Sequence, residues 1–273
     1  MLTQAEKGIA FRALHQRAQA FIIPNPWDVG TARLLAQIGF EALASTSAGY
    51  AFSVGKCDNE VGRERMLAHV AELAAATDLP VSGDLENGYG DDPATVAETV
   101  KLAAAAGLVG CSIEDSINRP GTTLYELELA AERVHAAAEA ARALPFTFTL
   151  TGRAENFLFP QPDLNDTIKR LQVYQEAGAD VLFAPGLTKK EDIAAVVSSV
   201  DRPVNVVMGL QGVQLGLAEL SELGVKRISV GSALTRAAFG AFLRAAREMR
   251  EYGTFTFAKE AVGYQELSAL FKS

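Results

Sequence analysis

The chain has 273 residues, and its content of 49% hydrophobic and 21% charged residues is typical of a folded protein with a large core. Its 33 acidic residues outnumber its 25 basic ones, giving a net charge of -8. No cluster of Lys or Arg could neutralise the phosphates of a nucleic acid, so we expect no nucleic-acid partner. The first residues, MLTQAEKGIAFRAL, are charged and helix-like, and no apolar run approaches the length of a membrane span. These features predict a cytoplasmic protein without a membrane partner.

Cysteine and histidine are too sparse to predict a disulfide framework or a zinc site. Cys57 and Cys111 lack any metal-binding spacing. The three histidines, His15, His69 and His135, fall in helix-like stretches, where a solvated or hydrogen-bonded side chain is the ordinary role.

One pattern recurs along the chain, in which a helix-like stretch ends at a glycine and an apolar strand follows. Further apolar runs lie between these units. The predicted strands in chain order are 20–25, the segment after Gly39, 80–84, the segment after Gly107, 146–153, the segment after Gly178, 203–207 and the segment after Gly224. Stretches between them, such as 63–77 and 129–144, repeat their apolar positions at helical spacing.

Nearly uniformly apolar strands that alternate with helices predict a parallel sheet that is buried on both faces. Eight such units fit an α/β fold of the (β/α)8 TIM-barrel type. A doubly wound open sheet has the same local pattern and stays open as an alternative. No linker rich in Pro or Ser divides the chain, so residues 1–273 are predicted to form a single domain.

Charged side chains follow three successive strands at their carboxyl ends, where a barrel builds its active site. Asp84 and Glu86 follow the third strand, Glu114 ends the fourth and Arg153 ends the fifth. Acids that meet at one rim repel each other unless a cation joins them, and hard oxygen ligands favour Mg²⁺ or Mn²⁺. The planar fork of Arg153 suits a substrate carboxylate. The alternative is that these acids cap helices or form surface ion pairs.

The chain resembles the isocitrate lyase/phosphoenolpyruvate mutase superfamily in segments that follow the family's order: PNPWDVGTARLL, STSAGY, VSGDLENGYGD, GCSIEDS, TGRAEN, FAPGL and PVNVV. This resemblance implies a (β/α)8 barrel, a Mg²⁺ ion and a small 2-oxo-acid or dicarboxylate substrate that reacts through an enolate-like intermediate. It also implies a homo-oligomer in which the C-terminal helical segment, roughly 236–273, is swapped between subunits, and in which such dimers pair into tetramers.

The resemblance also implies roles for individual acids. Asp84 matches the acid that contacts the metal most directly, and Glu86 matches the second acid of that motif. Glu114 matches the acid that ends the next strand, and these three are the predicted metal ligands. Asp58 matches an aspartate that the family shows in a Pro-Asp-Gly context, although the proline and the glycine are absent here. Asp58, Glu114 and Arg153 are the predicted catalytic residues.

The substrate-binding residues are carried over in the same way. Arg153 matches the substrate-binding arginine, and Asn205 matches a polar residue that faces the substrate. Tyr50 is predicted to bind substrate and is, with Asp58 and Glu114, a candidate for proton transfer. The loop whose N–H groups and serine hydroxyl hold the carboxylate and carbonyl end of the substrate is matched by Thr46, Ser47, Ala48 and Gly49.

The segment after the fourth strand departs from the family pattern. Carbon–carbon lyases of the family carry a Lys-Lys/Arg-Cys-Gly-His signature there, whereas this chain reads EDSINRPGTTLYELE, without a cysteine. Asn118, Arg119 and Pro120 only faintly echo the gating loop of the mutase and phosphonopyruvate-hydrolase branch. The leading hypothesis is a Mg²⁺-dependent lyase that cleaves or decarboxylates a small 2-oxo or 2-hydroxy dicarboxylate. The alternatives are a 2-oxo-acid-binding protein with little turnover and an enzyme of phosphorus–carbon bonds acting on a phosphonopyruvate-like substrate.

Overall fold

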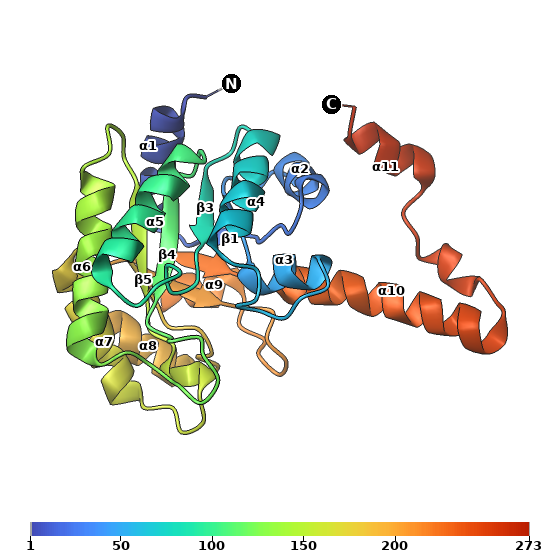
Figure 1. Cartoon of the computed structure of the whole chain (residues 1–273). Helices are drawn as coiled ribbons and strands as arrows, with labels where there is room; N and C mark the ends of the chain where they lie inside the picture. The colour runs from blue at the N-terminus through green and yellow to red at the C-terminus, as the bar shows by residue number, and fades with distance from the viewer. Residues whose placement is uncertain (1, 273) are drawn as a thin grey trace.

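Short parallel strands surrounded by helices form the body of the computed structural model, which describes residues 2–272 (Figure 1). The strands are Phe21–Ile23 (β1), Leu43–Ala44 (β2), Val81–Asp84 (β3), Gly110–Glu114 (β4), Thr149–Arg153 (β5), Val181–Phe183 (β6), Val204–Val207 (β7) and Arg227–Ser229 (β8). The helices are Gln4–His15 (α1), Val29–Ile38 (α2), Ser47–Ser53 (α3), Arg63–Ala76 (α4), Pro93–Ala105 (α5), Leu127–Arg142 (α6), Leu164–Ala177 (α7), Lys190–Ser198 (α8), Leu217–Glu222 (α9), Ala233–Tyr252 (α10) and Tyr264–Leu270 (α11), with 3₁₀ turns at Asn156–Leu158 (η1) and Thr256–Lys259 (η2).

The strands follow one another around the sheet in the order β1-β8-β7-β6-β5-β4-β3-β2, and every neighbouring pair is parallel. Where β2 and β1 approach each other, the N–H of Ala44 donates to the carbonyl of Pro24 at 3.1 Å, so the sheet is nearly closed. The strand order has no switch point, which a doubly wound sheet would require. The prediction of a (β/α)8 barrel is therefore confirmed, and the open-sheet alternative is wrong.

Local sequence signals end the helices where the recurring pattern predicted. Gly39 and Gly178 cap α2 and α7 in the left-handed conformation, with φ of 101° and 112°. Asp92 and Asp163 begin α5 and α7 by accepting hydrogen bonds from backbone N–H groups of the first turn. The two glycine caps let the chain turn within a few residues into the strands that follow, β2 and β6.

The interior of the barrel is unusually polar. Inward-facing positions carry Ser82, Ser112, Thr151, Asn205 and Ser229, where barrels of this type usually have bulky branched residues. Helix α1 closes the end of the barrel at the start of the strands with an apolar cluster around Phe11, Leu14, Phe21 and Ile23. The polar interior therefore opens toward the carboxyl ends of the strands.

The C-terminal segment leaves the barrel as an extended arm (Figure 1). Within α10 only Thr235 is buried, and apolar side chains such as Phe242 and Tyr252 are 68% and 74% exposed. The arm turns back at its end, where the side-chain amide of Gln37 on α2 donates to the carbonyl of Leu270. No helix among residues 2–272 is both long and apolar enough to cross a membrane.

The buried histidines make the stability of the fold sensitive to acid. His69 on α4 stacks on Tyr50 with 3.7 Å between ring centroids, and burial lowers the pKa of His69 from its ordinary 6.5 to about 4. Below pH 6.5 His69 binds a proton in the unfolded chain but stays neutral in the folded protein. The free energy of unfolding therefore falls as the pH decreases toward about 4.

We predict that His69→Phe, which keeps the stacking, reduces this slope by one proton, or about 1.4 kcal/mol per pH unit. Urea unfolding of the wild type and the variant at pH 7.5 and at pH 5 measures the difference. An unchanged slope would show that His69 is protonated in the folded state.

Candidate active site

A cavity of about 230 Å³ lies at the carboxyl ends of the strands. Several predicted residues line it together: Thr46, Ser47, Ala48, Asp58, Asp84, Arg153 and Asn205. A wider hollow of about 580 Å³ lies beside it and shares Ser47, Asp58 and Arg153 with it. Glu114 and Glu155 line this outer hollow. Residues from β2 through β8 thus meet at the end of the barrel where such folds place their active sites.

Arg153, at the end of β5, holds three carboxylates together. Its Nη1 lies 3.4 Å from Asp84 Oδ1 and 3.2 Å from Glu114 Oε2, and its Nε donates to Glu155. Glu114 meets Arg153 because the two residues are partners in the register of β4 and β5. The guanidinium also lies over the ring of Phe183, 5.2 Å from its centroid. One cation among three acids leaves the cluster with excess negative charge when all are ionised.

Burial shifts the protonation of the acids around Arg153. It raises the pKa of Glu155 to about 7, and Asp115 and Asp84 add to the rise although Arg153 opposes it. Burial also raises the pKa of Glu114 well above its usual range, and Asn118 donates to Glu114 Oε1 at 2.9 Å. These acids can therefore hold protons near neutral pH.

Asp84 is fixed from the opposite side by the start of α3. Its Oδ2 accepts hydrogen bonds from the N–H and the hydroxyl of Ser47, both at 3.0 Å. The N–H of Gly49 donates to the hydroxyl of Thr46, which caps α3. Two N–H groups of the predicted substrate loop are thus used within the protein, one of them to orient Asp84.

Glu86 lies two residues after the end of β3 in a strained conformation. Its φ is 50°, and its buried Oε1 has no hydrogen-bond partner among the described residues. Burial raises the pKa of Glu86 to about 8, and the charges of Asp84 and Asp58 add to this shift. Asp58 lies in an exposed loop at the mouth of the cavity, and enclosure of its carboxyl group together with Asp84 raises its pKa.

The residues present fit a hard dication such as Mg²⁺. Within residues 2–272, no three acidic, histidine or cysteine side chains are close enough to form a metal site. Asp84, Glu86 and Glu114 are therefore not arranged as three direct ligands. The unpartnered Glu86 oxygen and the excess negative charge around Asp84 suit Mg²⁺, which keeps several waters and takes one or two carboxylates.

The structure does not bring Tyr50 to the cavity. Because α3 begins at Ser47, Tyr50 lies a turn further along that helix, where it stacks on His69. Its hydroxyl accepts a hydrogen bond from Arg65 at 3.3 Å.

Sequence reasoning missed several residues that line or support the site. Asn25 follows β1, and its Oδ1 accepts the N–H groups of Val230 and Gly231, both at 2.9 Å. Tyr89 has a buried hydroxyl without a partner among the described residues, and burial followed by the charge of Glu86 raises its pKa. Arg227 lines the inner cavity from β8. A charged residue inside an apolar strand, as in KRISV, was the signal that could have identified Arg227.

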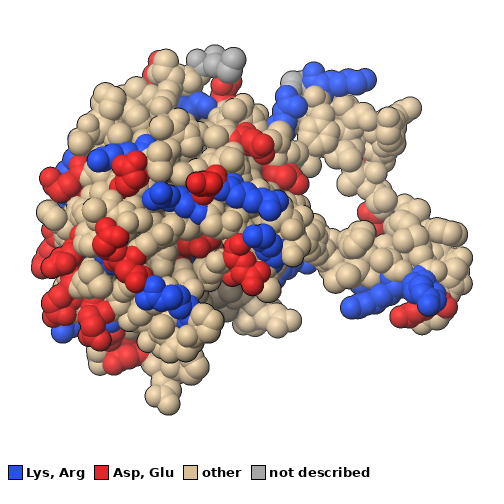
Figure 2. Space-filling view, in the orientation of Figure 1, with Lys and Arg blue, Asp and Glu red and all other residues tan. Residues whose placement is uncertain are grey.

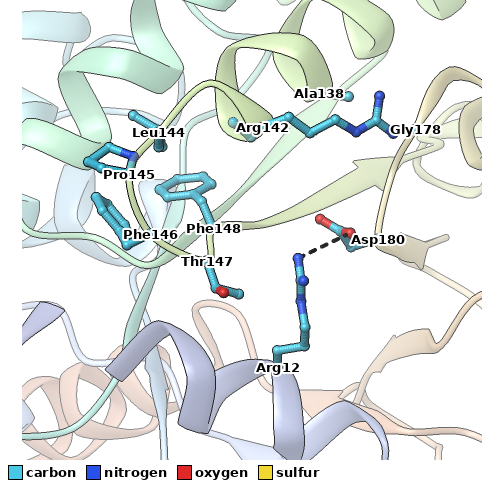
Figure 3. Close-up of a pocket in the computed structure, with 11 residues that line it drawn as sticks. Arg12, Ala138, Arg142, Leu144, Pro145, Phe146, Thr147, Phe148, Gly178 and Asp180 are labelled. Carbon is cyan, nitrogen blue, oxygen red and sulfur yellow. Dashed lines mark ion pairs between the residues drawn. The ribbon is translucent and has the colours of Figure 1, made fainter. Parts of the chain in front are cut away.

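A separate hollow of about 550 Å³ lies at the opposite end of the barrel (Figure 3). Arg12 from α1 points toward Asp180, which precedes β6, and their charged groups are 3.8 Å apart. The rest of the lining comes from the end of α6 and the loop into β5. None of the predicted site residues lies there, so the cavity at the carboxyl ends of the strands is the candidate active site.

Comparison with known proteins agrees with this geometry. The model of the phosphoenolpyruvate phosphomutase family matches residues 11–250. A Burkholderia cenocepacia structure provisionally described as a lyase/mutase is 62% identical, covers 99% of this chain and 97% of its own, and has a TM-score of 0.96. An uncharacterized Mycobacterium tuberculosis protein is 33% identical over 96% of this chain and 95% of its own length.

Two further relatives have named activities. A 2-methylisocitrate lyase of Halalkalibacterium halodurans is 27% identical over 99% of this chain and 83% of its own length. An oxaloacetate decarboxylase of Pseudomonas savastanoi pv. phaseolicola is 27% identical over 89% of this chain and 84% of its own length. This chain therefore belongs to the phosphoenolpyruvate phosphomutase family and is an enzyme of the isocitrate lyase/phosphoenolpyruvate mutase superfamily.

Proposed function

We propose that this protein is a Mg²⁺-dependent lyase that cleaves or decarboxylates a small 2-oxo or 2-hydroxy dicarboxylic acid through an enolate. The observation that carries this proposal is the cluster of Arg153 with Asp84, Glu114 and Glu155 beside a cavity of about 230 Å³. The cavity suits a small molecule, and the activities of the named relatives support carbon–carbon bond cleavage.

Asp84 is the residue best placed to hold the ion, and Glu86 and Glu114 would contribute through water. A bound Mg²⁺, or Mn²⁺ in its place, would act as a Lewis acid on the 2-oxo oxygen. Arg153 would pair with a substrate carboxylate, because a buried guanidinium among acids is held in one orientation. Ser47 and Asn205, which both line the cavity, would align the breaking bond.

Asp58 and Glu114 are the remaining candidates for proton transfer. Burial raises the pKa of both carboxyl groups, which favours their protonated forms, and the rise is large for Glu114. Asp58 lines both parts of the hollow, and Glu114 lines the outer part. Tyr50 is not retained as a candidate because its hydroxyl faces Arg65.

The loop after β4 bears on which reaction is favoured. Its ends pair as an antiparallel bridge between Ser116 and Leu124, and Asn118 within it donates to Glu114. The loop supplies no thiol. Cleavage of an isocitrate-type substrate needs a proton delivered to the departing carbon, whereas carbon dioxide leaves a β-oxo acid without one.

We expect Asp84→Asn to reduce kcat/KM by about 10³-fold or more, because it removes the charge that orients Ser47, Arg153 and the metal. The fold should be retained, since the amide has the same volume. Pyruvate release from oxaloacetate with and without EDTA, together with circular dichroism, measures both effects. Activity that survives both the substitution and EDTA would reject the metal site.

We expect oxaloacetate to be turned over with a higher kcat/KM than 2-methylisocitrate at saturating Mg²⁺, because general acid catalysis at the departing carbon is typically worth about 10²- to 10⁴-fold. Parallel assays of both substrates make the comparison. A 2-methylisocitrate rate about tenfold higher would mean that another residue replaces the thiol. Absence of turnover with either substrate would favour a 2-oxo-acid-binding protein.

We further propose that the arm, residues 236–273, packs on a partner subunit in a dimer of helix-swapped dimers. An opening separates the arm from the barrel, and the visible face of the arm is largely uncharged (Figure 2). Its exposed apolar side chains include Phe242, Leu243, Met249 and Phe255. An apolar surface of this kind is typical of an interface between subunits.

We expect Phe242→Asp to shift the protein to smaller species in sedimentation velocity, because a charge would be buried in the interface. Ile9→Asp is the matched control, since Ile9 on α1 is 63% exposed and lies away from the arm. Equal sedimentation of the wild type and both variants would contradict the swapped arrangement.

A further inference from the structure

Arg227 is a buried cation inside the barrel. It begins β8, is 5% exposed and lines the inner cavity. Because it precedes Ser229 on a strand whose carboxyl end faces the cavity mouth, its side chain lies deeper than that of Ser229, at the cavity floor. None of the residues assigned to the proposed reaction accounts for a charge at this depth.

All the hydrogen-bond partners of Arg227 are neutral. Its Nε donates to Asn205 Oδ1 at 2.9 Å, and its Nη2 donates to the hydroxyl of Thr151 at 3.0 Å. Its Nη1 lies 3.4 Å from His15 Nε2. His15 is uncharged, because burial lowers its pKa to about 3 and its Nδ1 bonds to the carbonyl of Phe11.

No carboxylate within residues 2–272 forms an ion pair with Arg227, although Arg153 has three. A buried charge without a counter-ion is costly for the fold unless a ligand neutralises it. An anionic ligand would therefore neutralise the charge of Arg227, which no group of the described protein neutralises.

Arg227 also decides how Asn205 faces the cavity. A guanidinium can only donate, so the oxygen of the Asn205 amide must point toward Arg227. The amide nitrogen then donates to the hydroxyl of Ser229 at 3.0 Å and keeps a second N–H. Asn205 and Ser229 both line the cavity. The wall formed by β7 and β8 therefore presents a hydrogen-bond donor of Asn205 with the positive charge of Arg227 behind it.

The two sides of the cavity therefore differ in charge. Asp84 on β3 and its neighbours form an acidic wall, while Arg227 and the exposed Arg236 line the side formed by β8 and the start of α10. The acidic wall can receive an anionic group only through Arg153 or a bound cation, whereas the basic wall receives one directly. A molecule with a single anionic end would therefore use only one of these walls.

We propose that Arg227 is a specificity-determining residue, which selects substrates with a second carboxylate remote from the 2-oxo-acid end and places that carboxylate against Asn205 and Ser229. This inference rests on the proposed function for the orientation of the substrate. It assigns the second carboxylate of the proposed dicarboxylic acid to the wall formed by β7 and β8 and gives Arg227 a positioning role through Asn205.

The test compares malate with its 4-amide, which differ in the charge of the remote carboxylate. Isothermal titration in the presence of Mg²⁺ gives both dissociation constants without turnover. The wild type should bind malate about tenfold or more tightly than the amide, because the amide cannot form a charge-assisted hydrogen bond at this end. Arg227→Gln, which keeps a donor and removes the charge, should bring the two constants to within about twofold.

Two further variants complete the set. Arg227→Lys keeps the charge and should retain most of the preference for malate. Arg17→Gln removes an exposed arginine that pairs with Glu41 and should change neither constant. The inference is overturned if the wild type shows no preference, if Arg227→Gln keeps the wild-type ratio, or if both ligands weaken equally. Loss of the preference without detectable lyase activity would reject the proposed reaction but support the selection of dianions by Arg227.

Discussion

The ion cluster around Arg153 is the interaction on which the rest of the site depends. One guanidinium contacts carboxylates from three successive strand ends, and those strand ends are brought together only when the sheet curves into a barrel. The cluster raises the local negative charge above what Arg153 can balance, so the neighbouring acids hold protons or require a cation. The same contacts hold Asp84 and, through it, the start of α3.

The polar interior of the barrel connects the Arg153 cluster with Arg227 on β8. Serine, threonine and asparagine side chains replace the branched residues that usually fill such a barrel, so the cavity continues inward as far as Arg227. Helix α1 then closes the barrel with Phe11 and the neutral His15. These polar side chains contribute less to the stability of the core than branched apolar ones would, and they leave a cavity with one acidic and one basic side. A small dianionic substrate with a bound metal would need this arrangement.

The loop after β4 and the C-terminal arm bear on the reaction and on the assembly proposed for this chain. The loop places Asn118 on Glu114 and provides no thiol, which favours reactions without protonation at the departing carbon. The arm exposes aromatic and aliphatic side chains that a single subunit does not cover. Both segments lie at the edge of the barrel, and the loop also contributes Tyr125 to the hydrophobic core.

The sequence by itself determined the fold and the position of most of the site. Apolar strands that alternate with glycine-capped helices predict a parallel sheet buried on both faces, and acids at the strand ends then share one edge, as Asp84 and Glu114 do. Only the tertiary structure decided which side chains meet. The side chain of Tyr50 lies outside the cavity and stacks on His69 because a helix starts at Ser47. Arg227 lines the cavity because its side chain points into the barrel from β8. Such outcomes depend on helix start points and barrel register, which fix side-chain direction and which local patterns do not encode.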